Sequence, residues 1–136
     1  MAGKRFVLDT NIWVSYIIKH RLAELTEQIF NHDLQILISE ELIDELSENL
    51  HKPKFKKYLT KPVKEYINQV LSISVFISAE KIFNQSIDPD DDFLFDLAIK
   101  SKSEYFVTGD KPLFNISIEG LKIITLKEFR DMFESK

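Results

Sequence analysis

The sequence predicts an α/β fold in which a mainly parallel sheet of four to five strands lies between layers of helices. Short apolar, β-branched stretches alternate along the chain with longer stretches whose apolar residues recur at helical spacing. Helices rather than hairpin turns separate most of the strands, and strands joined in this way run parallel with helices on both faces. With 136 residues and 44% hydrophobic content, residues 1–136 are expected to form one domain with one core.

Each predicted element has its own local signal. The strands are the apolar runs at 5–9, 34–39, 73–78, 104–110 and 121–125. The helices are expected at 11–19, 22–30, 40–50, from about 60–62 onward, after the acidic turn at 88–92, and after 125. Ser39 can cap the third helix, and Thr125 with Glu128 forms a capping box for the last. On the second helix, Leu22, Leu25, Ile29 and Phe30 form the predicted apolar face.

Composition excludes several classes of protein. There is no cysteine, so neither disulfides nor thiolate metal sites can form. No apolar run approaches the length of a membrane span, so a soluble, cytoplasmic protein that does not bind membranes is expected. The net charge of −4 argues against a uniformly basic surface for nucleic acid. His20, His32 and His51 share no ligand spacing and are expected at the surface.

Two aspartates stand where predicted strands end. Asp9 closes the first strand, and Asp110 closes the stretch 104–110. Ligands of parallel sheets bind at the carboxyl ends of the strands, so these two acids are expected to meet at one edge. Gly109, before Asp110, can allow a tight turn or the close approach of a ligand.

Helical geometry selects two further acids. Glu45 lies roughly 115° from the centre of the apolar stripe of its helix, whereas Asp44 lies roughly 145° away and points more to solvent. After the turn at 88–92, Asp91 lies one turn before Leu94 on nearly the same stripe, and Asp92 points the other way. Asp91 is therefore favoured over Asp92 as a functional acid, and Asp88 and Asp90 are expected to serve the turn and the cap.

Each acidic motif also has a structural explanation. Aspartates at a helix N-terminus usually cap it, and an acidic helix is usually solvated on one face. Four carboxylates at one edge, however, would repel one another by several kcal/mol, so such a cluster requires cations. An all-carboxylate site selects Mg²⁺ or Mn²⁺, and such ions support phosphodiester cleavage. The sequence therefore indicates nuclease chemistry.

Four blocks of the chain carry a family resemblance, namely "FVLDTNIWVS", "SEELIDELSENLHKPKF", "DPDDDFLFDLAIKSKSEYFVTGDKPLF" and "IITLKEF". In this order and spacing they resemble the PIN domain, in particular its bacterial branch of VapC-like toxins from toxin–antitoxin pairs. The resemblance implies a three-layer α/β/α sandwich and a Mg²⁺- or Mn²⁺-dependent endoribonuclease. It further implies a homodimer and a small antitoxin protein as partner.

Carried over residue by residue, the catalytic and metal-binding quartet of the family falls on Asp9, Glu45, Asp91 and Asp110. Asn11 matches a polar residue that can orient a metal ligand or a water, and Thr108 matches a small hydroxyl residue. Asp92 is a possible supporting acid. One departure is Pro112, which stands where this branch often has another acid, so the resemblance leaves one or two metal ions open.

RNA binding requires positive charge near the acidic edge. Residues 51–64 concentrate six lysines, with Phe55 and Tyr58 between them, directly after the helix that carries Glu45. Lysines can contact phosphates while aromatic rings stack on unpaired bases, although a solvated connection between helices would have the same composition. The candidates for RNA binding are Lys52, Lys54, Phe55, Lys56, Lys57 and, beside Asp110, Lys111.

Two other classes of function remain open from the sequence. Aspartate phosphoryl-transfer modules, such as phosphatases and receiver domains, also place acids at strand ends. The phosphatase motif requires a second aspartate where this chain has Asn11. The other alternative is a PIN scaffold of weak catalytic activity that binds RNA or protein.

Overall fold

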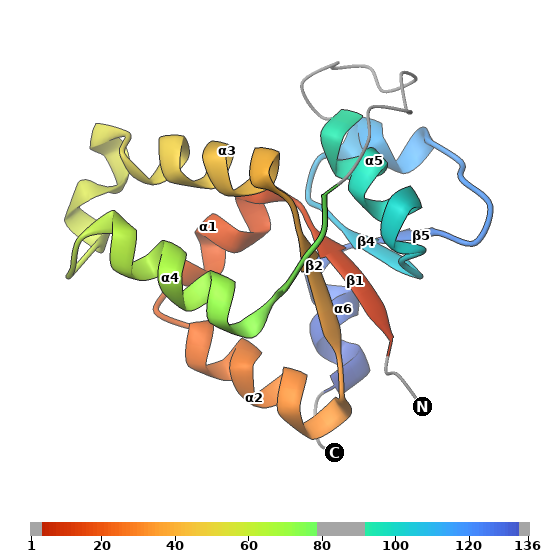
Figure 1. The fold of residues 1–136 in the computed structure, drawn as a ribbon, viewed down its shortest axis with the longest axis horizontal. Coiled ribbons are helices and arrows are strands. Elements are labelled where there is room, and N and C mark those ends of the chain that lie inside the picture. The colour runs from red at the N-terminus through yellow and green to blue at the C-terminus, as the bar shows by residue number, and fades with distance from the viewer. Residues whose placement is uncertain (1–3, 79–91, 134–136) are drawn as a thin grey trace.

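The computed structural model describes residues 4–78 and 92–133, which form a parallel sheet with helices on both faces (Figure 1). The strands are β1 (Arg5–Leu8), β2 (Gln35–Ile38), β3 (Val75–Phe76), β4 (Tyr105–Val107) and β5 (Lys122–Ile124). The helices are α1 (Thr10–Ile18), α2 (Leu22–His32), α3 (Glu40–Leu50), α4 (Val63–Ile73), α5 (Asp92–Ser101) and α6 (Leu126–Phe133). Two 3₁₀ segments are η1 (Pro53–Tyr58) and η3 (Lys111–Asn115).

The five strands are in the order β3-β2-β1-β4-β5, and every pair is parallel. Strand β1 lies in the centre: Phe6 is in register with Ile36 of β2 on one side and with Tyr105 of β4 on the other. This arrangement confirms the predicted α/β class and the parallel sheet.

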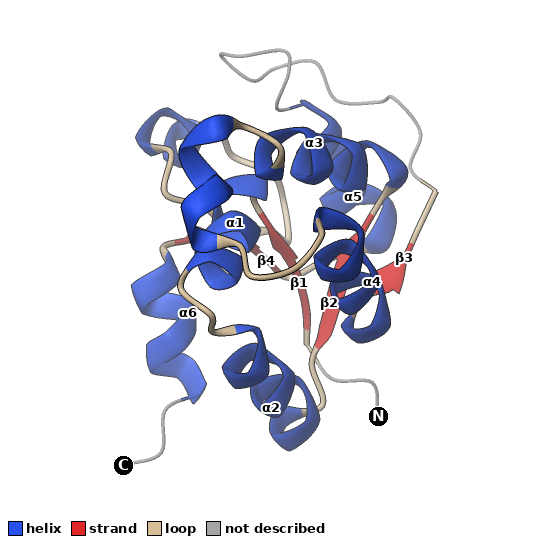
Figure 2. Ribbon diagram, turned by 90° about the vertical axis from the view of Figure 1, so that its left-hand side faces the viewer, coloured by secondary structure: helices blue, strands red, loops and turns tan. Residues whose placement is uncertain are grey.

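Aromatic side chains show how the helices cover the two faces. On one face Phe6 packs against Phe129 of α6, with ring centroids 5.1 Å apart. On the other face Phe106 packs against Phe95 of α5, with centroids 4.9 Å apart. Neighbouring residues of a strand point to opposite faces, so α5 and α6 lie on opposite sides of the sheet, as Figure 2 shows. The three-layer sandwich is thereby confirmed.

The predicted helix starts are formed by the predicted capping residues. Ser39 Oγ accepts a hydrogen bond from the Leu42 N–H at 3.3 Å. Thr125 and Glu128 exchange reciprocal bonds of 3.0 and 3.1 Å. These contacts satisfy backbone N–H groups that have no partner within the first turn of a helix.

The apolar face predicted for α2 is wrong at one position. Leu22 and Leu25 are buried, but the Phe30 side chain is 80% exposed. Phe30 lies roughly 100° around the helix from Ile29, which turns it away from the sheet. The spacing therefore predicted the stripe correctly up to Ile29 and extended it one residue too far.

The two 3₁₀ segments were not predicted. Pro53 and Pro112 each lie in the first turn of their segment, where the fixed φ of proline is compatible with a helical start. Among the helices of the described residues, none is long and apolar enough to cross a membrane.

Candidate active site

Asp9 lies where the order of strands reverses. From β1 the chain builds β2 and β3 on one side of the sheet and then returns to add β4 and β5 on the other. The carboxyl ends of β1 and β4 therefore border the crevice in which doubly wound parallel sheets bind their ligands. Backbone bonds hold this edge: the Asp9 N–H donates to Val107 O at 2.9 Å, and the Thr108 N–H donates to Ile124 O at 3.0 Å.

A short chain of hydrogen bonds joins the ends of β1 and β4. The Thr108 hydroxyl donates to Asp9 Oδ2 at 2.7 Å, and the Asp110 N–H donates to Thr108 Oγ1 at 3.1 Å. Thr108 is fully buried, Asp9 is 6% exposed, and Asp110 is exposed. The structure thus brings together Asp9, Thr108 and Asp110 as the sequence predicts.

The electrostatic environment of Asp9 is unfavourable for a negative charge. Burial raises the pKa of the Asp9 carboxyl above its ordinary value, and the charge of Asp110 raises it further. The Thr108 hydroxyl, and to a smaller extent the backbone N–H groups of Asn11 and Thr10, lower it. Burial is thus the main cost of the charged form of this carboxyl, and a bound cation would reduce that cost.

Asp9 occupies the N-cap position of α1, but its side chain makes no capping hydrogen bond. Its main-chain carbonyl accepts bonds from Ile12 and Trp13 instead. Asn11 is exposed in the first turn of α1, and within the described part of the chain its side chain has no hydrogen-bond partner.

Helix α5 brings acids to the same edge. Arg5 Nη1 donates to Ser101 O at 2.8 Å, so the last turn of α5 lies beside the amino end of β1. The ten residues of α5 then extend about 15 Å back along the sheet. Asp92, the first residue of α5, consequently lies at the carboxyl edge.

Asp92 was expected to point away from the core, yet it is half-buried. The prediction assumed a single buried stripe, whereas α5 packs against β1, β2 and also α3. Asp96, four residues on and therefore on the same side of the helix, is only 3% exposed. Sequence reasoning missed Asp96. A charged residue enclosed by Phe95 and Leu97 was the available signal, because carboxylates are seldom buried without a partner.

Glu45 lies in the middle of α3 and is half-buried, while its neighbour Asp44 is exposed. This difference agrees with the helical angles. Helix α3 packs against α1 and α5, the two helices whose first turns carry Asn11 and Asp92. The predicted catalytic acid Asp91 lies outside the described residues, as do Asp88 and Asp90.

Across residues 4–78 and 92–133, no three acidic or histidine side chains lie close enough together to hold a metal ion. The described pair is Asp9 with Asp110. Mg²⁺ commonly keeps several waters and binds through one or two carboxylates, so this hard oxygen pair, with one carboxylate buried, suits such a cation. Asp9 and Asp110 are the residues that would hold it.

Gly109 separates Thr108 from Asp110 without requiring a left-handed backbone, since only Gly120 among the described glycines has positive φ. A Cβ built on Gly109 would meet no atom within 4 Å. The glycine is therefore not needed here for a left-handed turn. Open space for an approaching ligand agrees with the structure.

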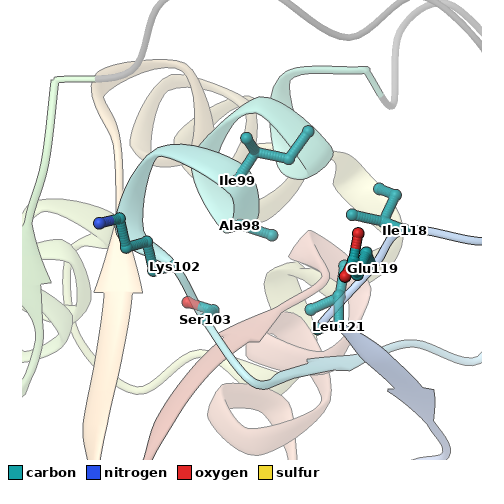
Figure 3. Close-up of a pocket in the computed structure, with 8 residues that line it drawn as sticks. Ala98, Ile99, Lys102, Ser103, Ile118, Glu119 and Leu121 are labelled. Carbon is teal, nitrogen blue, oxygen red and sulfur yellow. The ribbon is translucent and has the colours of Figure 1, made fainter.

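A separate cavity of about 210 Å³ lies between the last turn of α5 and the loop before β5 (Figure 3). Ala98, Ile99 and Ser103 line one side, and Ile118, Glu119 and Leu121 line the other. None of the predicted site residues borders this cavity. It is therefore distinct from the acidic edge.

The predicted RNA-binding residues are divided between two places. Lys111 follows Asp110 directly and is exposed. The lysines of residues 51–64 lie instead beyond the C-terminus of α3, at the far left of Figure 1. Phe55 is half-buried and packs against the core, which disagrees with a role as an open stacking surface. Tyr58 is 41% exposed.

These features define a class: a three-layer α/β protein with an acidic ligand site at the switch point of a parallel sheet. The PIN domain family model matches residues 5–112. The chain therefore belongs to the PIN domain family, which confirms the resemblance found in the sequence blocks. PIN domains are generally nucleases, so the family supports the expected class of enzyme.

Two similar proteins extend the comparison. An uncharacterized protein of Methanocaldococcus jannaschii, MJ1680, is 29% identical over 96% of this chain and 92% of its own. A chain in the crystal structure of VapBC2 from Rickettsia felis, bound to a DNA fragment from their promoter, has a TM-score of 0.58 and 18% identity. That match covers 89% of this chain and 98% of the other, and it shows the shared VapC-like fold.

Proposed function

We propose that this protein is a Mg²⁺- or Mn²⁺-dependent endoribonuclease. The observation that carries the proposal is the linked arrangement of Asp9, Thr108 and Asp110 at the β1/β4 edge. A buried carboxylate that is fixed by Thr108 and lies near an exposed one would gain from a divalent cation.

In the proposed mechanism, Asp9, Asp91 and Asp110 would hold the cation, and Glu45 would complete the site directly or through a water. When bound, the metal lowers the pKa of a water and neutralises charge on the phosphate that is cleaved. Thr108 fixes one oxygen of Asp9, so the other oxygen keeps a defined direction. We assign to Asn11 and Asp92, in the first turns of α1 and α5, the role of orienting water or ligands.

The space in front of Gly109 lets a phosphate approach the backbone, and the exposed Lys111 offers it a positive charge. No covalent bond between protein and RNA is required, because water is the nucleophile. The product expected from the family is RNA with a free 5′-phosphate.

We further propose that the protein is the toxin of a toxin–antitoxin pair, forms homodimers, and acts in the cytoplasm as a single domain. The likeness to VapBC2, a complex solved on promoter DNA, supports a small antitoxin as partner. The phosphoryl-transfer alternative loses support from the family match, which covers most of the chain. A weakly catalytic RNA- or protein-binding scaffold is the remaining alternative.

The test is cleavage of a total RNA pool by the purified protein with Mg²⁺ or Mn²⁺, with mapping of the cleaved ends. Asp9→Asn should abolish cleavage and leave the circular dichroism spectrum unchanged. Asp44→Asn is the matched control, because Asp44 is an exposed acid on the outer side of α3. This variant should cleave RNA like the wild type. Full activity of Asp9→Asn would refute the proposal, and no cleavage by the wild type with either ion would favour the scaffold.

A further inference from the structure

We propose that the groove between the end of α3 and the start of α4 is a second RNA site, which holds the backbone of a single strand at a distance from the acidic edge. This inference deepens the proposed function and rests on it for the identity of the substrate. The groove has a volume of about 860 Å³. Its lining is formed by Leu50, His51, Pro53, Lys56, Leu59, Thr60, Lys61, Pro62 and Val63.

Charge is strongly segregated in this chain. Residues 51–64 contain six of the 18 lysines and arginines and none of the 22 acids. The segment therefore carries +6, and the remainder of the protein carries −10 at neutral pH. Such a local concentration of lysines in an acidic protein creates the positive potential that attracts a polyanion.

The lysines of this segment are free to bind a ligand. Lys52, Lys54, Lys56, Lys57, Lys61 and Lys64 are all exposed. None of them pairs with an acid anywhere in the described ranges, where the ion pairs are Lys127–Asp131 and Arg130–Glu24. Lys61 Nζ donates to the neutral Gln69 Oε1 at 3.2 Å. Their charges are consequently not neutralised within this part of the protein.

Aromatic rings accompany these charges. Lys57 lies over the ring of Tyr58 at 5.2 Å, and Lys61 lies over the ring of Tyr66 at 4.8 Å. Tyr58 lies between the lining residues Lys56 and Leu59 in the chain, outside the lining itself, and is 41% exposed. A base beside the groove could therefore stack on it when Lys57 moves to a phosphate. Unpaired bases can stack in this way, whereas bases in a duplex are enclosed. An acidic peptide would use the lysines but would gain nothing comparable from the exposed ring.

The position of the groove sets the length of RNA that can use it. Ser39 directly follows β2 at the carboxyl edge of the sheet, and α3 extends from there for 11 residues, or about 16 Å. Figure 1 shows α3 leading from the sheet to this end of the molecule. At about 3.4 Å per stacked nucleotide, a strand needs about five nucleotides to connect the two sites. The groove should therefore promote cleavage of RNAs of about five nucleotides or more, and not of a trinucleotide that occupies the acidic edge alone.

The experiment measures binding of a fluorescent 12-nucleotide oligouridylate by anisotropy, in EDTA so that the RNA stays intact, from 50 to 200 mM salt. The test variant is Lys56→Ala/Lys61→Ala. The matched control is Lys100→Ala/Lys122→Ala, which removes two exposed lysines elsewhere. Thermal melting verifies that both variants are folded.

Each phosphate contact with single-stranded RNA contributes about −0.7 to the slope of log affinity against log salt. The groove variant lacks two such contacts, so its slope should be less steep by about 1.4. Its affinity defect should shrink about sevenfold between 50 and 200 mM salt. The control should retain the wild-type slope.

An unchanged slope in the groove variant, or an equal loss in the control, would overturn the proposal. Polyglutamate of matched charge that competes as well as the oligonucleotide would assign the groove to an acidic peptide instead. Equal binding of a 12-base-pair RNA duplex would reject the preference for single strands. If binding behaves as expected while cleavage fails, the proposed nuclease function falls and the groove remains an RNA site.

Discussion

The Thr108 hydroxyl is bonded to the Asp9 carboxylate at 2.7 Å although 99 positions separate the two residues in the chain. The bond crosses from β4 to β1 and lies out of contact with solvent. It gives the Asp9 carboxylate a fixed orientation that the strand end alone would not impose.

Replacement of Thr108 by valine should weaken both the fold and the activity. A hydrogen bond to a charged group contributes about 1.5–3 kcal/mol, so chemical denaturation should show a loss of that size at neutral pH. Loss of a group that orients a metal ligand typically lowers activity about 10- to 100-fold. Thr108→Ser keeps the hydroxyl and should recover most of the activity; an inactive Ser variant would show that the methyl group, not the hydrogen bond, matters.

Asp9→Asn should make the protein more stable at neutral pH. Since burial raises the pKa of Asp9 in the folded state, the folded protein binds the proton more tightly than the unfolded chain. The free energy of unfolding contributed by this group is then highest below its unfolded pKa and falls as pH rises through the folded pKa. Without metal, the melting temperatures of the wild type and of Asp9→Asn should therefore differ little at acid pH. The melting temperature of Asp9→Asn should rise relative to that of the wild type as pH increases. A difference in melting temperature that narrows with rising pH would contradict the upward shift of the Asp9 pKa.

Divalent cations should stabilise the wild-type protein. A ligand that binds only the folded state at 100 times its Kd adds about 2.7 kcal/mol, which a thermal shift in Mn²⁺ would detect and EDTA would reverse. Asp9→Asn and Asp110→Asn should lose the shift, and Asp44→Asn should keep it. Equal shifts in all four proteins would place the ion elsewhere.

Glu45→Gln and Asp44→Asn form a pair of neutralisations on adjacent residues of α3. Glu45 is half-buried and Asp44 is exposed, so only the first should reduce RNA cleavage, with melting temperatures close to the wild type in both. The rate of cleavage of a short oligonucleotide is the measurement. Equal activities would remove Glu45 from the proposed site.

Much of the fold could be predicted because its signals are local. Ser39, Thr125 and Glu128 act within one turn of the helices that they cap, and Asp9 and Asp110 follow apolar strands directly. The prediction that Asp9 and Asp110 lie at one edge needed only one general rule about parallel sheets, whereas Thr108 came from the family resemblance.

The errors concern surfaces that depend on distant partners. The burial of Asp96 and the partial burial of Asp92 accompany the packing of α5 against β1, β2 and α3, which a single predicted stripe does not include. The position of the lysine segment depends on the direction of α3, which takes residues 51–64 away from the acidic edge. Glu45 and these lysines are close in sequence, which suggested that they are close in space. The straight helix α3 instead carries the lysines away from the acidic edge.

The pairing of β1 with β4 has a consequence for when the site can exist. During synthesis, β1 and Asp9 are made first, but their partner strand and Thr108 follow about a hundred residues later. A nascent chain therefore has no complete acidic edge until the second half of the sheet has emerged. Because contacts between such distant segments form slowly, Asp9 acquires its buried hydroxyl partner only late in folding.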